Sequence, residues 1–203
     1  LEDGHTVHDL PTILYFMDRI ALASASPRRK KKLEWAGLAF DILPADADES
    51  IPPGMEVNKI PVEIARRKAE AVKSQVEPGT IILAADTLVV VDRELIGKPV
   101  DKSDAVRMLS LLSGRMHQVI TGVLITDSKR EIAFAETTNV WFHPLDFSAI
   151  EYYIDHFKPY DKAGAYAIQE WIGVTGIREI QGDFYNVMGL PVSRVIQQLK
   201  NFA

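Results

Sequence analysis

The 203-residue chain contains no cysteine, which excludes disulfide bonds, thiolate zinc sites and cysteine nucleophiles. No apolar run reaches the roughly 18 residues that a membrane-spanning helix needs. The two common glycine-rich phosphate loops, G-x-x-x-x-G-K-[ST] and G-x-G-x-x-G, are also missing. The five histidines show no metal-binding spacing. Any anion or metal must therefore be held by a different arrangement of residues.

The net charge is -5, with 47% hydrophobic and 25% charged residues. This is an ordinary soluble composition, and a chain of this length can bury a core without metal or disulfide cross-links. The negative charge argues against broad attraction to nucleic acid or to an anionic membrane, so we expect neither as a partner. An anionic ligand must be bound by a local group of cations.

Residues 1–16 are expected to be an upstream leader, and residues 17–203 a single domain. The first 17 residues have only a short apolar stretch, with acidic residues on both sides. They lack the basic n-region of a signal peptide. Met17 stands directly before the first predicted strand and marks the start of the predicted domain.

Helical and strand patterns alternate, with hairpins between them, and predict an α/β protein with a mixed, twisted sheet. The expected strands are 19–24, 118–126, 131–142, 164–169 and 177–180, with two shorter runs in 80–92 that are separated by Ala-Asp-Thr. The long pair 118–126 and 131–142 is expected to join near Asp127-Ser128. The expected helices are 26–37, 61–74, 103–114, 148–157 and 189–199. Their predicted boundaries are marked by Ser26 and Pro27, Gly37, Ser103, Gly114, and a capping box of Ser148 with Glu151.

The stretch "LASASPRR" (22–29) places two serines and two arginines where a buried strand meets a helix. A helix start offers backbone N–H groups and partial positive charge to an anion. The guanidinium groups of Arg28 and Arg29 suit phosphate oxygens, and Ser24 and Ser26 add hydroxyl donors. The alternative is a capped helix with a solvated basic face.

Acidic residues occur at two informative places. Asp86 follows the apolar run "IILAA", and a carboxylate at the end of a buried strand needs a partner. In open α/β sheets this is also where ligands bind, although an Asx turn would give the same sequence. Asp46, Asp48 and Glu49 lie in an acidic loop that could hold Mg²⁺ or Mn²⁺, or could simply be solvated.

Three lysines lie beside turns or helices. Lys68 is on a predicted helix, where a lysine is most often a solvated charge. Lys98 in "GKP" and Lys162 in "DKAG" are better candidates for a site, because the small residues beside them place each lysine on a tight turn of the backbone. None of these residues identifies a site when taken alone.

The order and spacing of eight stretches resemble the Maf family of nucleoside triphosphate pyrophosphatases. The stretches are "LASASPRR" (22–29), "DES" (48–50), "ARRKAEAV" (65–72), "AADT" (84–87), "GKP" (97–99), "LSG" with "HQVITGV" (112–123), "DKAGAYAIQ" (161–169) and "GDFYNVMGLP" (182–191). The resemblance implies a two-lobed fold like that of the inosine triphosphate pyrophosphatase group, with the nucleotide in a central cleft. It also implies a cytoplasmic, divalent-metal-dependent enzyme, often a homodimer, that releases pyrophosphate.

The resemblance also implies roles for individual residues. Arg29, Thr87 and Gln169 match the branch that acts on dTTP and UTP, rather than the branch that hydrolyses 7-methyl-GTP. Phosphoanhydride hydrolysis needs in-line water, charge neutralisation and positioning. Alternatives are a modified-nucleotide pyrophosphatase, a nucleotide-binding regulator without turnover, and a nucleic-acid binder, which the net charge disfavours. The predicted site comprises Asp86 as proton acceptor, Glu49 and Asp86 as ligands of Mg²⁺ or Mn²⁺, and Ser24, Ser26, Arg28, Lys68, Lys98 and Lys162 as phosphate-binding residues.

Overall fold

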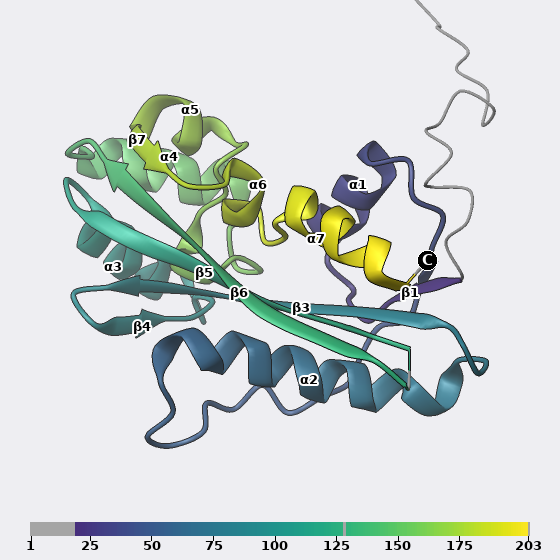
Figure 1. Ribbon diagram of the computed structural model, residues 1–203. Coiled ribbons are helices and arrows are strands. Elements are labelled where there is room, and N and C mark those ends of the chain that lie inside the picture. The colour runs from purple at the N-terminus through teal and green to yellow at the C-terminus, as the bar shows by residue number, and fades with distance from the viewer. Residues whose placement is uncertain (1–18, 128, 203) are drawn as a thin grey trace, which may run out of the picture.

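The computed structural model describes residues 19–127 and 129–202. The predicted leader, and Ser128 in the predicted turn, lie outside these residues. A seven-stranded sheet has the order β2-β1-β3-β5-β6-β7, with β4 paired to β3 (Figure 1). The strands are β1 (Ile20–Leu22), β2 (Asp41–Ile42), β3 (Ile81–Val91), β4 (Glu94–Ile96), β5 (Met116–Thr126), β6 (Glu131–Phe142) and β7 (Ile177–Gln181).

Strand β1 runs parallel to both β2 and β3, whereas all other pairs are antiparallel. The sheet is therefore mixed and is flanked by helices, which confirms the predicted fold class. No helix in the described ranges is long and apolar enough to cross a membrane. The helices are α1 (Pro27–Trp35), α2 (Ile60–Val72), α3 (Lys102–Leu112), α4 (Phe147–Phe157), α5 (Trp171–Gly176), α6 (Phe184–Val187) and α7 (Val192–Leu199), with short 3₁₀ turns that include η5 (Ala163–Ala165).

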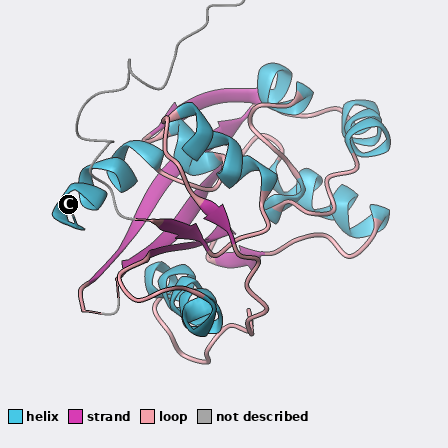
Figure 2. Cartoon of the chain, turned by 90° about the vertical axis from the view of Figure 1, so that its right-hand side faces the viewer, coloured by secondary structure: helices cyan, strands magenta, loops and turns pink. Residues whose placement is uncertain are grey.

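The helices form separate layers on the sheet. Helix α2 lies along one face, and α1 and α7 lie on the opposite side of the sheet (Figures 1 and 2). One core cluster joins α1 and α7 to β1 and to the first half of β3. A second cluster joins α3 and α4 to the last residues of β3 and to the near ends of β5 and β6. Strand β3 thus contributes to two separate core clusters, one toward each of its ends.

Strand β3 differs most from the sequence prediction. Its eleven residues are continuous, so the two runs predicted in 80–92 are one strand. Asp86 lies in the middle of this strand, and is neither in an Asx turn nor at a strand end. The reason is that β5 pairs with β3 without interruption from Ile82 to Val90, so that the polar residues Asp86 and Thr87 stay within the ladder.

Three further elements correct the sequence prediction. Helix α3 is capped by Asp101, whose side chain accepts a hydrogen bond from the Asp104 backbone, and not by Ser103. Helix α4 begins after Asp146, so the predicted capping box at Ser148 does not form. The predicted strand 164–169 is absent, because Gly164 adopts a left-handed conformation, with φ of 71°, within the turn η5. By contrast, the Ser26 cap and Pro27 start of α1 are confirmed.

Gly122 allows α2 to approach the sheet. It pairs with Asp86 across β3 and β5. A Cβ atom added at Gly122 would lie 2.2 Å from backbone atoms of both Pro61 and Val62. Backbone atoms cannot move aside as a side chain can, so only glycine fits where the start of α2 crosses β5.

We predict that Gly122→Ala destabilises the fold by about 3 kcal/mol, because overpacking against backbone is costly. Urea denaturation followed by circular dichroism measures the change. Gly97→Ala is the matched control, since a Cβ there meets nothing within 4 Å, and it should alter stability by less than about 1 kcal/mol. Equal stability of G122A and G97A would contradict the close approach.

Candidate active site

An open length of sheet edge forms the centre of the site. On one side, β1 pairs with β3 only at Ile81–Leu83, and β4 pairs only with Val89–Val91. Between these segments, residues 84–88 have a strand partner in the described chain on β5 alone. A cavity of about 330 Å³ lies at this opening, beside the carboxyl end of β1. Such strand ends are where open α/β sheets bind ligands.

Asp86 and Thr87 reach this cavity from opposite faces of β3, because neighbouring side chains on a strand alternate. Asp86 faces α2 and Thr87 faces α1, as their hydrogen bonds to Lys68 and Arg29 show. Both can line one cavity because the strand edge between them is uncovered. The open edge therefore joins two faces that a complete sheet would separate.

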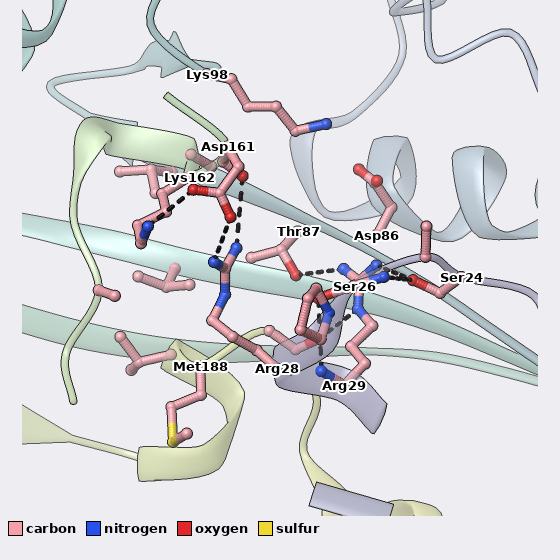
Figure 3. Close-up of a pocket in the computed structure, with 18 of the residues that line it drawn as sticks. Ser24, Ser26, Arg28, Arg29, Asp86, Thr87, Lys98, Asp161, Lys162 and Met188 are labelled. Carbon is pink, nitrogen blue, oxygen red and sulfur yellow. Dashed lines mark hydrogen bonds and ion pairs between the residues drawn. The ribbon is translucent and has the colours of Figure 1, made fainter. Parts of the chain in front are cut away.

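Asp86 lies against Lys68 of α2. The Nζ atom of Lys68 is 2.6 Å from Oδ1 of Asp86 and 2.7 Å from Oε1 of Glu49, and both Lys68 and Asp86 are buried. Lys98 extends from the opposite side of the opening, with Nζ 3.4 Å from Glu49 (Figure 3). One buried ammonium group therefore draws two carboxylates together inside a cavity lined by other cations.

The charge of Glu49 depends on these lysines. Partial burial would raise the pKa of Glu49, but hydrogen bonds and charge interactions with Lys68 and Lys98 more than offset this and lower it. The carboxylate is thus ionised at neutral pH. Its contribution to stability is present above the ordinary pKa of 4.5 and is lost as the pH falls through the lower folded value.

The acidic residues of the predicted loop differ in their positions. Glu49 lines the cavity, whereas Asp46 and Asp48 do not. Asp48 instead accepts hydrogen bonds from the backbone and side chain of Ser50, and lies 3.4 Å from Arg67. The solvated-loop interpretation therefore applies to Asp48, and the ligand interpretation is left to Glu49.

The corner between β1 and α1 supplies the next group of residues. Ser24, Ser26, Arg28 and Arg29 all line the cavity. The Ser26 hydroxyl accepts from the Arg29 backbone and so caps α1. Of the two arginines, only Arg28 extends into the opening, where Nη1 donates to Asp161 at 2.7 Å (Figure 3).

Arg29 has a different geometry from the one expected of a group that reads a base. Its guanidinium is buried, and its three nitrogen atoms donate to Gly189 O, Ser24 Oγ and Thr87 Oγ1 at 2.8, 3.1 and 3.1 Å. Burial lowers the pKa of Arg29, although the group stays charged at neutral pH. Arg29 and Thr87 are therefore brought together, and Gln169 lines the same cavity.

A buried lysine supports the same wall. Lys32, one turn after Arg29 on α1, is fully buried and donates to Met188 O at 2.7 Å. Burial, with the nearby Arg29 and Arg28, lowers the pKa of Lys32 to about 7. Two successive carbonyl groups, those of Met188 and Gly189 directly after α6, are thus tied to one face of α1. The segment 187–189, which is the last residue of α6 and the two that follow it, forms a wall of the cavity.

Several of these residues were not assigned a role from the sequence. Asp161, Tyr166 and the segment 187–189 line the cavity, and Lys32 supports it. Most of them lie in the stretches "DKAGAYAIQ" and "GDFYNVMGLP". These motifs therefore included the residues but did not predict a function for each of them. Lys32 had no signal beyond its place in a run of basic residues, in which the other two lysines, Lys30 and Lys31, are exposed.

The cavity charges nearly balance. Five cationic and three acidic side chains line the cavity, which leaves two positive charges in excess. No three acidic or histidine side chains gather as a metal site in the part of the chain that the structure describes. Glu49 and Asp86 both contact the Lys68 ammonium group, and their hard oxygen atoms are of the kind that Mg²⁺ prefers when a ligand supplies further oxygens.

We predict that Lys68→Met destabilises the fold by about 3 kcal/mol at neutral pH, because it leaves the buried Asp86 carboxylate without its partner. Lys102→Met removes a similarly short ion pair on the surface, in which the Lys102 Nζ atom is 2.7 Å from Asp155. It should cost less than about 1 kcal/mol. Denaturant titrations of both variants measure the difference, and equal losses would show that the Lys68 pair contributes no more than a surface pair.

Comparison with known proteins gives a consistent set of relatives. Residues 19–202 match the family model described as Maf-like protein. A protein of Cytophaga hutchinsonii named dTTP/UTP pyrophosphatase is 50% identical over 89% of this chain and 83% of its own length. Proteins with the same name from Bacteroides fragilis and Porphyromonas gingivalis are 46% and 45% identical. These matches cover 90% and 91% of this chain, and 95% and 94% of the relatives.

Proposed function

Because this chain belongs to the Maf-like protein family, we propose that it hydrolyses nucleoside triphosphates to the monophosphate and pyrophosphate. The names of its relatives support dTTP and UTP as the favoured substrates. The assignment to this family rests on a match over nearly all of the described chain. The predicted single two-lobed domain over 17–203, a cytoplasmic location and a homodimer belong to the same proposal.

The observation that carries this proposal is the placement of Asp86. A pure anion-binding site would contain cations and amide groups, and a buried carboxylate beside phosphates would weaken it. Here Asp86 is held 2.6 Å from Lys68 within a cation-lined cavity. Such a carboxylate is suited to accept a proton from water that attacks phosphorus.

In the proposed mechanism, the cations position the triphosphate and Asp86 orients the attacking water. In this proposal Arg28, Lys98 and Lys162 bind phosphate oxygens and stabilise the pyrophosphate that leaves, which their position in the lining of the cavity supports. Ser24 and Ser26 add neutral donors at the start of α1. Attack at the α-phosphorus makes a bond from the water oxygen to phosphorus and breaks the bond to the bridging oxygen, while Asp86 takes the proton.

We include a divalent cation, Mg²⁺ or Mn²⁺, in this proposal. Glu49 and Asp86 would hold it together with phosphate oxygens, because the described residues offer too few ligands alone. When bound, the ion neutralises charge on the phosphates and polarises the phosphoryl group. A triphosphate with one such ion carries about two negative charges, which complements the excess of two positive charges around the cavity.

The proposed choice of base rests on Gln169 and on the shape set by Arg29 and Thr87. Gln169 offers an amide donor and an acceptor, and uracil and thymine present N3–H between two carbonyl groups. The nitrogen atoms of Arg29 are occupied by protein partners, so it contributes through the wall at Gly189. A polar site of this kind rejects a base that leaves its groups unpaired.

A panel assay for pyrophosphate release tests the proposed function. The substrates are dTTP, UTP, CTP, ATP, GTP and 7-methyl-GTP, each with Mg²⁺ or Mn²⁺. We expect kcat/KM for dTTP and UTP to exceed the purine values at least tenfold. Equal rates on GTP would overturn the base preference, and no pyrophosphate from any substrate would overturn the reaction.

We predict that Asp86→Asn lowers kcat by about 10²–10⁴-fold, the usual contribution of a general base, while nucleotide binding is retained. Steady-state kinetics and equilibrium binding measure the two effects. Asp127→Asn is the matched control, because Asp127 is equally buried but lies outside the cavity. Near-normal turnover of folded D86N would remove Asp86 from the proposed role.

We predict that Glu49→Gln raises the Mg²⁺ concentration for half-maximal rate by about tenfold, because an anionic oxygen ligand is lost. Titration of the initial rate with Mg²⁺ measures this. Asp48→Asn changes the neighbouring acid in the same loop, which does not line the cavity, and should leave the titration unchanged. Identical curves for E49Q and the wild type would assign Glu49 to lysine pairing alone.

A further inference from the structure

Asp161 joins two cations that come from distant parts of the chain. Its Oδ2 accepts from Arg28 Nη1 at 2.7 Å, and its Oδ1 accepts from Lys162 Nζ at 2.8 Å. The Asp161 backbone carbonyl also accepts from Arg28 Nη2 at 3.4 Å. Arg28 lies in the first turn of α1, whereas Asp161 and Lys162 precede η5, so this contact spans the cavity (Figure 3).

The two cations keep donors free for a ligand. Each uses one strong hydrogen bond to a separate oxygen of the same carboxylate. The Nε atom of Arg28 has no partner within the described chain, and Lys162 has only a longer contact, 3.4 Å, to Glu170. Asp161 therefore fixes where the charges are without filling their hydrogen-bonding capacity.

Electrostatics favours this arrangement. Without Asp161, Arg28 and Lys162 would repel each other across the opening. Burial raises the pKa of Asp161, but hydrogen bonds from Lys162 and Arg28 more than offset this and keep it below its usual value. The carboxylate is thus ionised at neutral pH and carries one negative charge between two positive ones.

Fold stability accounts for only part of this contact. The Asp161 side chain is 58% exposed, so its pair with Arg28 contributes little to stability, whereas its pair with Lys162 has one buried partner. A link between two segments that both line the cavity has its main effect on the cavity itself. A long side chain that is already ordered before binding does not lose further conformational entropy when the ligand binds.

We propose that Asp161 is a positioning residue that holds Arg28 and Lys162 together, so that both cations act on one polyphosphate chain. This inference rests on the proposed function for the identity of the substrate, but the cation pairing itself can be tested with an inorganic anion. Asp161 acts through the two cations and does not contact the reacting atoms.

The test measures binding of inorganic tripolyphosphate by calorimetry, together with dTTP kinetics. We expect Asp161→Asn to weaken tripolyphosphate binding about tenfold, from the disorder of two side chains. We also expect KM for dTTP to rise about as much while kcat changes less than threefold. In an Arg28→Ala background the same change should weaken binding clearly less, because one of its two partners is gone.

Asp155→Asn is the matched control, since Asp155 forms an exposed pair with Lys102 outside the cavity, and it should leave binding unchanged. Unchanged or tighter binding by D161N would overturn the inference and make Asp161 a competing anion. An equal loss in the R28A background, or no tripolyphosphate binding by the wild type, would also overturn it. Wild-type binding without pyrophosphate release from any nucleotide would instead refute the proposed function and leave the pairing in place.

Discussion

The buried contact between Lys68 and Asp86 is the constraint on which the site depends. An ammonium group and a carboxylate are stable in this interior only when they meet closely, and their nitrogen and oxygen atoms are 2.6 Å apart. That distance requires α2 to lie directly on β3 and β5. Gly122, the partner of Asp86 in the ladder, makes this approach sterically feasible because it has no side chain.

The open edge of β3 turns this contact into a cavity. Because β1 and β4 cover only the two ends of the strand, residues from both faces reach the same space. Arg29 and Lys32 then fix the segment 187–189 as its far wall. The cavity is thus lined by residues from many distant stretches of chain, held by buried basic side chains together with apolar residues of one core cluster, such as Val89, Tyr166 and Met188.

The sequence by itself determined the fold class and most elements. The alternation of apolar segments is a local property, so the long strands β5 and β6 and the helix start at Ser26 and Pro27 could be predicted. Boundaries that depend on partners could not. Strand β3 is continuous because β5 pairs along it. Helix α4 begins after Asp146 rather than at Ser148, and no side-chain hydrogen bond caps it there.

For the site, the sequence determined which residue types were available, and the order of its motifs identified the family. Only the tertiary structure decided how they are used. Arg28 and Arg29 are neighbours with the same chemistry, yet one extends into the opening, while each of the three nitrogen atoms of the other donates to Ser24, Thr87 or Gly189. The reason is physical: hydrogen-bond partners 58 and 160 residues away, in the case of Arg29, are set by packing and leave no signal in the local sequence.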